Sequence, residues 1–147
     1  MSLDILQYKS YLKLNSKEGK SLIFDRIRKK YVAFTPEEMV RQLFIEFLIR
    51  ERKIPEKYIA VEKQIHILDK NYRFDILVFN KKGQAVMIVE CKSHKINISD
   101  KTALQISKYN YLITAPYLCL TNGKITKFFK IDFDRGTIDS VENFDLS

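Results

Sequence analysis

Two acidic residues lie in runs of the sequence that are otherwise typical of buried β-strands. Asp75 is the second residue of FDILVF, Glu90 is the last residue of AVMIVE, and Lys92 follows two positions later. Because successive side chains of a strand point to opposite faces, Glu90 and Lys92 share one face and Cys91 lies on the other. Two carboxylates on one face of a sheet are suited to a hard cation such as Mg²⁺, which prefers oxygen ligands.

The residues between the two runs predict how the acids are placed. NKKGQ has the composition of a turn, so the two runs, rich in β-branched and aromatic residues, should form a hairpin. If the loop is the four residues KKGQ, Asn80 pairs with Ala85. The same register then places Asp75 directly opposite Glu90. Like charges directly opposite each other destabilise a sheet, which indicates a cation between them.

An ion pair is the alternative that the residues alone leave open. Arg73 precedes Asp75 by two positions, and Lys92 lies further along the face that carries Glu90. Acidic residues of strands often pair with such neighbours at the edge of a sheet. Either cation would then hold Asp75 without a metal.

A helix is predicted ahead of the hairpin. Thr35 is its N-cap, Pro36 lies in the first turn, and Glu38 completes a capping box three residues after the cap. The helix should continue to about Arg52. Glu38 and Gln42 are one turn apart and share a face, although Glu38 could equally serve only as a cap. The buried stripe is expected to consist of Met39, Leu43, Phe44, Phe47 and Leu48.

The remaining elements follow from alternation and turn signals. YIAVEKQIHIL at 58–68 predicts a strand before the hairpin, and His66 within it is expected to be an edge residue rather than a general base. Asn122-Gly123 is a strong hairpin signal. The other expected elements are a hairpin within 8–24, a basic connector at 25–30, a helix over 100–113, strands at 117–121 and 124–131, and a weak last strand before an acidic tail at 142–145.

The composition is that of one soluble domain. The 147 residues are 46% hydrophobic and 30% charged, and a net charge of +8 favours polyanionic partners. We expect an N-terminal hairpin and connector in residues 1–33, a core in 34–131, and a C-terminal strand and tail in 132–147. No apolar run has the length of a membrane span and the first residues lack a signal-peptide layout, so a cytoplasmic protein is expected. Cys91 and Cys119 lie in apolar runs and should be reduced core residues.

Five segments of the chain carry a resemblance to a known family. TPEEMVRQLFIEFLI, RFDILVF, VECKS, QISKY and APYLCLTNG follow one another between Thr35 and Gly123. Together they resemble the N-terminal nuclease domain of type I restriction enzyme R subunits. Asp75 with Glu90-Cys91-Lys92 resembles the active-site pattern of the PD-(D/E)XK nuclease superfamily, with Phe74 in place of Pro. The resemblance implies an α/β fold with a restriction-endonuclease-like core, a mixed β-sheet flanked by helices, beside the N-terminal β-hairpin.

The resemblance also implies a metal-dependent DNA endonuclease. Asp75, Glu90 and the backbone carbonyl of Cys91 would hold Mg²⁺, for which Mn²⁺ should substitute, and Lys92 would orient the attacking water and counter charge on the phosphate. The first helix of the family supplies a glutamate near the metal, here Glu38. Gln105 and Tyr109 match a Gln-x-x-x-Tyr motif that orients substrate or water at the metal site.

The expected partner is DNA. The candidate contacts to nucleic acid are Gln42, Tyr109, Lys95, Lys81 and Lys82. The domain would cleave DNA in restriction, defence or DNA processing, as a homodimer or with separately encoded restriction-system subunits. The alternative is a module that keeps this fold to bind nucleic acid or assemble with partners, without turnover.

Overall fold

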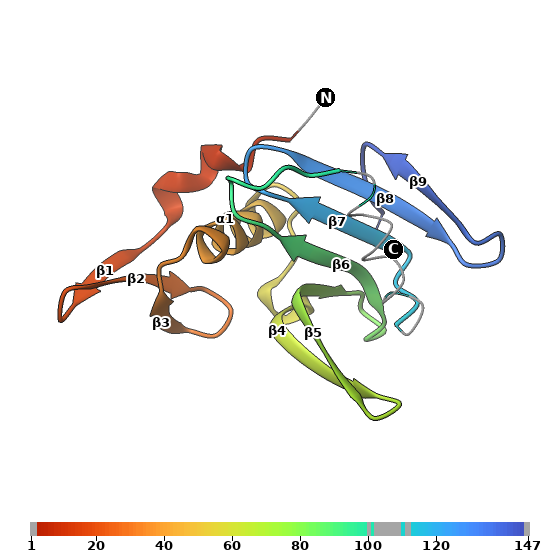
Figure 1. The fold of residues 1–147 in the computed structure, drawn as a ribbon, viewed down its shortest axis with the longest axis horizontal. Coiled ribbons are helices and arrows are strands. Elements are labelled where there is room, and N and C mark those ends of the chain that lie inside the picture. Colours follow the sequence, from red (N-terminus) through yellow and green to blue (C-terminus); the bar gives the residue numbers. More distant parts are fainter. Residues whose placement is uncertain (1–2, 100, 102–109, 111–112, 146–147) are drawn as a thin grey trace.

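The fold is a mixed six-stranded sheet with one long helix against it and a small second sheet beyond the helix (Figure 1). It comes from a computed structural model that describes residues 3–99, 101, 110 and 113–145. The large sheet has the order β4-β5-β6-β7-β8-β9, and only β6 and β7 in it are parallel. Its strands are β4 (Ile59–Ile67), β5 (Lys70–Phe79), β6 (Ala85–Cys91), β7 (Tyr117–Thr121), β8 (Thr126–Asp132) and β9 (Thr137–Val141).

The predicted hairpin is formed by β5 and β6, with a change in register near its turn. Ala85 pairs with Phe79 rather than with Asn80 as expected, because a β-bulge intervenes at this end of the strand pair. Beyond the bulge, Ile76 pairs with Val89, which is the predicted register. The predicted loop length is therefore wrong only at the turn, and the predicted pairing of the strands holds from Val78 to Ile76, next to Asp75.

One face of the large sheet packs on α1 (Pro36–Arg50). The N-cap is as predicted, since the backbone N–H of Glu38 donates to the Thr35 hydroxyl over 3.0 Å. Phe44 and Leu48 are fully buried, as expected for the apolar stripe. The opposite face of the sheet has a second core, formed by Phe74, Leu77, Ile88, Ala115, Leu118, Leu120, Phe129 and Ile131 with Ile98.

The helix also buries a polar side, which its amphipathic pattern did not predict. Glu38, Arg41, Gln42 and Glu46 are each at most 8% exposed. Glu62 and Asp75 of the large sheet contact Arg41, and Glu38 and Glu46 contact arginines that come from a second, smaller sheet. It contains β1 (Leu14–Lys17), β2 (Lys20–Asp25) and β3 (Lys30–Ala33), and it follows the 3-10 helix η1 (Ile5–Tyr11).

The N-terminal hairpin was predicted correctly only in part. Tyr8–Tyr11 belongs to η1 rather than to a strand, and the predicted basic connector ends in a third strand, β3. The turn between β1 and β2 is the two residues Glu18 and Gly19, whose φ angles of 52° and 75° suit a tight hairpin with the twist of the strands. We refer to β1, β2 and β3 together as the small sheet.

Ion pairs fasten the small sheet to α1. In the turn between β2 and β3, Arg26 contacts Glu46 at 2.9 Å and Glu56, in the 3-10 helix η2 (Glu56–Tyr58), at 2.7 Å. Arg28 from the same turn contacts Glu38 at 3.2 Å. These arginines of the predicted connector are therefore partners of buried acids rather than a fully solvated surface.

Several other predictions are confirmed. The strand at 58–68 is β4, the strands around Asn122-Gly123 are β7 and β8, and β9 follows the turn at 134–136. Cys91 and Cys119 are free and buried. The helix predicted over 100–113 falls largely outside the described residues, and no helix among those described is long and apolar enough to span a membrane.

Candidate active site

Asp75 and Glu90 come together on neighbouring strands, as the sequence predicted. Asp75 precedes Ile76 and Glu90 follows Val89, the last pair in the register of β5 and β6, and the charge of Asp75 raises the pKa of Glu90, so the two carboxyl groups lie close together. Asp75 Oδ2 accepts a hydrogen bond from the backbone N–H of Cys91 over 2.8 Å. The Asp75 carboxylate is thus tied to the strand that carries Glu90.

The environment of Glu90 opposes its ionisation. Burial, followed by the negative charge of Asp75, raises the pKa of Glu90 to about 8, while the positive charge of Lys92 acts in the other direction. Glu90 and Lys92 also line an open pocket of about 510 Å³ with Lys70, Asn71, Tyr72, Arg73 and Phe74. The pair therefore has one carboxyl group that holds its proton near neutral pH, next to a space that solvent can enter.

Arg41 is the site residue that sequence reasoning missed. Its Nη2 atom lies 2.6 Å from Glu62 Oε1 and 3.6 Å from Asp75 Oδ1, and its Nε atom lies 3.5 Å from Glu38 Oε2. The residue is only 6% exposed, and Nε and Nη1 have no hydrogen-bond partner among the residues that the structure describes. An arginine three positions after Glu38 on the same helix face was the available signal, but such residues are usually on the surface.

The ion pair considered for Asp75 is formed by a different cation. Arg73 contacts Glu62 on β4 and is not the ion-pair partner of Asp75 among the described contacts. Glu62 has a φ of 52°, an uncommon value for a residue other than glycine. It links Arg41 and Arg73, so a row of alternating charges runs from α1 across β4 to β5.

Glu38 and Gln42 are built into the same network. Glu38 accepts hydrogen bonds from Arg28 and Gln42, each at 3.2 Å, so its carboxylate serves the α1 network rather than only the cap. Gln42 in turn accepts a hydrogen bond from the backbone N–H of Arg26 over 3.2 Å and is 2% exposed. A contact between Gln42 and nucleic acid would first require these hydrogen bonds to open.

A comparison with protein families identifies the region that contains these residues. The family model described as Type I restriction enzyme R protein N terminus (HSDR_N) matches residues 36–144. The chain belongs to this family. No curated protein matches the chain.

The match of the R protein N-terminal family begins at the first residue of α1 and includes every residue of the candidate site. It leaves out η1 and the small sheet, which end at Ala33. The carboxylate pair, Lys92 and Arg41 are therefore parts of the region that defines the family, and Arg28 reaches the site from outside it.

Other predicted site residues lie at a distance or outside the described residues. Lys81 and Lys82 are exposed in the turn between β5 and β6, about five residues along the strands from the acids, or roughly 17 Å. Lys95 is exposed in the segment after β6. Gln105 and Tyr109 lie outside the described residues. His66 is exposed, with Nδ1 2.8 Å from Asn71 Oδ1, as expected for an edge residue.

The donor set at the carboxylate pair fits a hard divalent cation. Within the described part of the chain, no three side chains of His, Cys, Asp or Glu are grouped as a metal site. Two carboxylates with a backbone carbonyl and water are nevertheless a sufficient set for Mg²⁺. Burial, and after it the negative charge of Asp75, raises the pKa of Glu90, and a cation bound by the two carboxylates would act in the opposite direction.

Proposed function

We propose that this domain is a metal-dependent endonuclease that hydrolyses phosphodiester bonds of DNA in restriction, defence or DNA processing. The observation that carries the proposal is the approach of Asp75 and Glu90, with Lys92 beside them, in a domain of the R protein N-terminal family. Membership of the PD-(D/E)XK superfamily is part of the proposal. The protein would act on DNA as a homodimer or with separately encoded subunits of a restriction system.

Each residue of the site would have a distinct role. Asp75, Glu90 and the carbonyl of Cys91 would hold Mg²⁺ or Mn²⁺, which when bound polarises the scissile phosphate and acidifies a water molecule. Cys91 N–H donates to Asp75 Oδ2 and Arg41 lies 3.6 Å from Oδ1, so a metal bound at Oδ1 would share that oxygen with Arg41. Lys92 would orient water and offset the charge that builds up on the phosphate, because an ammonium beside two carboxylates remains charged.

A second function is favoured by one specific contact. Arg41 lies against Asp75 and could neutralise it without any metal, as expected in a domain that keeps the fold only to bind nucleic acid or to assemble. In that case the carboxylate pair would be structural. The two functions differ in whether the site responds to a divalent cation.

Cleavage of plasmid DNA by the purified protein tests the proposal. We expect activity that requires Mg²⁺ or Mn²⁺ and is lost in Asp75→Asn, Glu90→Gln and Lys92→Ala. The matched control is Asp69→Asn, at an exposed position in the turn between β4 and β5 whose φ of 64° an asparagine tolerates. Equal activity in the wild type and all four variants would identify a contaminating nuclease and refute the proposal.

Melting curves provide a test that needs no substrate. A metal that binds only the folded protein stabilises it by RT ln(1 + [L]/Kd), about 1.4 kcal/mol at ten times Kd. The wild type should show this rise in Tm and Asp75→Asn should lose most of it. A wild-type protein without a metal response would favour the non-catalytic function.

A further inference from the structure

The positive charge of the chain is concentrated in its N-terminal part. Residues 8–33 contain eight Lys and Arg and two acidic residues, so they carry +6 of the total charge of +8. They include the small sheet, and they precede Pro36, where the family match begins. The matched region, residues 36–144, contains 18 Lys and Arg and 14 acidic residues, a net charge of +4, so positive charge is denser in residues 8–33 than in the region that the family model describes.

The lysines of the small sheet share its outward face. Ile23 and Asp25 are fully buried, so the residues that alternate with them in β2 point away from the core. Lys20 is one of these, and Lys17 pairs directly with it. Lys13 is also on this face, because its carbonyl accepts a hydrogen bond from the backbone N–H of Phe24 over 2.9 Å.

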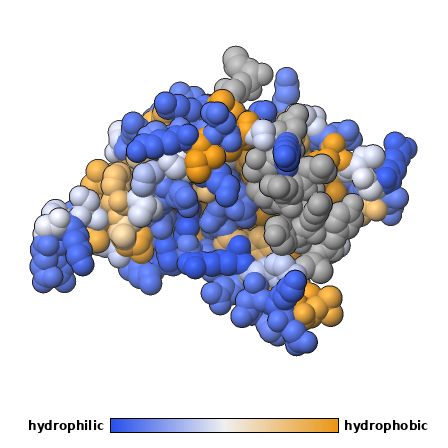
Figure 2. All heavy atoms as spheres, viewed as in Figure 1, coloured by the Kyte–Doolittle hydropathy of each residue, from blue (hydrophilic) through white to orange (hydrophobic). Residues whose placement is uncertain are grey.

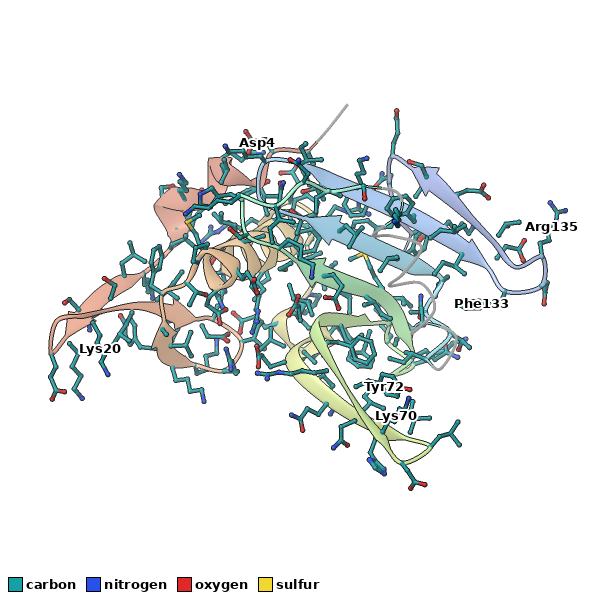
Figure 3. All side chains as sticks on the ribbon, viewed as in Figure 1. Asp4, Lys20, Lys70, Tyr72, Phe133 and Arg135 are labelled. Carbon is teal, nitrogen blue, oxygen red and sulfur yellow. The ribbon has the colours of Figure 1, made fainter. Side chains whose placement is uncertain are left out.

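The pairing of Lys17 with Lys20 is unfavourable unless an anion is present. Like charges directly opposite each other on a sheet repel, and neither residue is buried. Figure 3 shows Lys20 at the outer end of the small sheet, projecting away from the body of the protein. A phosphate group between the two ammonium groups would remove the repulsion.

Aromatic rings lie next to these lysines. Lys13 Nζ is 5.5 Å from the centre of the Phe24 ring, and the rings of Phe24 and Tyr31 meet edge to face at 5.2 Å. Tyr31 is 42% exposed. Lysines that follow a backbone and aromatic rings on which bases stack are the combination that binds nucleic acid without sequence preference.

A pocket of about 290 Å³ continues this surface toward α1. It is lined by two aromatic residues and four cations, Tyr11, Phe24, Lys13, Arg26, Lys29 and Arg50, together with Leu12, Gln42 and Glu46. Among the residues that the structure describes, Glu46 is the only acidic side chain that lines it. Arg26 and Arg50 are paired with Glu46, and Lys29 is paired with Glu56, so the pocket connects Lys13 to α1 through a mixed set of charges.

The turn between β2 and β3 is connected to the carboxylate pair through charged side chains of α1. Arg28 contacts Glu38, Glu38 contacts Arg41, and Arg41 contacts Asp75, so three ion pairs connect the sheet to the site. Figure 2 shows the small sheet and the tip of β4 and β5 as two projections, largely hydrophilic with some hydrophobic atoms, and an indented outline between them.

We propose that the outward face of the small sheet, defined by Lys13, Lys17, Lys20 and Tyr31, is a docking surface for the phosphate backbone of DNA. It holds the strand while the carboxylate pair acts on it. This inference rests on the proposed function for the identity of the polyanion. It assigns binding of the phosphate backbone to a part of the chain outside the family match.

Salt-dependent DNA binding in EDTA tests the inference. The test variant is Lys13→Gln/Lys17→Gln/Lys20→Gln, and the matched control is Lys57→Gln/Lys124→Gln/Lys130→Gln, which also removes three exposed lysines. Binding of labelled single-stranded and duplex DNA is measured by fluorescence anisotropy across a range of salt concentrations, with circular dichroism to confirm folding. Each lost phosphate contact lowers the slope of log Kobs against log salt by about 0.7 for single strands or 0.9 for duplex.

The expected result is a slope reduced by about 2 to 3 in the test variant and nearly unchanged in the control. Tyr31→Ala should weaken binding of single-stranded DNA more than binding of duplex. Equal losses in the test and control variants would overturn the inference, because the charge would then act without a defined surface. An unchanged slope in the test variant would mean that these lysines are exposed to solvent but make no contact with phosphate groups, which would also overturn the inference.

The two proposals fail in different ways. If the wild type binds DNA and cleaves it with metal, but the test variant binds equally well, only the docking surface is refuted. If the wild type binds no DNA at low salt, the docking surface and the DNA substrate are both refuted. If the test variant loses binding while Asp75→Asn binds DNA normally and the wild type never cleaves, the docking surface stands and the nuclease does not.

Discussion

Replacing Glu90 with glutamine should change how the stability of the metal-free protein depends on pH. In the folded protein, burial and the charge of Asp75 raise the pKa of Glu90 to about 8, from an ordinary value of 4.5. Between these two values the folded state binds a proton that the unfolded chain releases. Wild-type stability should therefore fall as pH rises from about 4.5 to 8 and change no further, through this group, outside that window.

The size of the effect follows from the number of protons. One proton difference between the folded and unfolded states corresponds to about 1.4 kcal/mol per pH unit. Between pH 5 and pH 7 the wild type should lose up to about 3 kcal/mol relative to Glu90→Gln, as an upper limit because Glu90 is not fully shielded from water. For a domain of this size that is a difference of several degrees in Tm.

Urea or thermal unfolding at pH 5, 6, 7 and 8 in EDTA measures the difference. Glu37→Gln, at an exposed position in the first turn of α1, is the matched control and should run parallel to the wild type. Addition of Mg²⁺ should stabilise the wild type more at pH 8 than at pH 5, because the ligand must be deprotonated. A constant difference between wild type and Glu90→Gln at all four pH values would refute the raised pKa and the repulsion behind it.

Two further predictions concern α1. Arg41→Met should lower the free energy of unfolding by about 3 kcal/mol or more, because it leaves Glu62 and Asp75 without the cation that they share. Arg41→Lys should recover only part of this loss, since an ammonium lacks the planar fork of the guanidinium. Urea denaturation measures both variants, and a wild-type midpoint in Arg41→Met would contradict the network. Thr35→Ala should cost about 1 kcal/mol by removing the hydrogen bond to the backbone N–H of Glu38, with Thr35→Ser as the control that retains it, and equal stability of the two variants would contradict the cap.

The parts of the fold that could be predicted are those set by local rules. Thr35 and Pro36 defined the start of α1, and the alternation around Asp75 and Glu90 predicted the hairpin that carries both acids. The error at Ala85 was confined to the turn, because the number of loop residues does not reveal a bulge.

The parts that could not be predicted depend on contacts between distant segments. Arg41 has the sequence signature of a surface residue, and it is buried only because Glu62 and Asp75 approach from the large sheet. β3 was hidden within a charged run, since KYVA is short and becomes a strand only by pairing with β2. The hydrophobic periodicity of a sequence describes one helix or strand at a time, so it cannot reveal a contact between distant segments.

The way in which the small sheet is attached limits how the chain can be shortened. Glu38 and Glu46 are nearly fully buried, and their contacts include Arg28 and Arg26, which lie ahead of the first residue of the family match. Truncation to the matched region would remove both arginines and leave two carboxylates facing a newly exposed helix surface. The segment before Pro36 lies outside the family match, but its arginines stabilise buried carboxylates of α1. A deletion of this segment would therefore change stability as well as function. Point substitutions on the outer face of the small sheet separate the two effects.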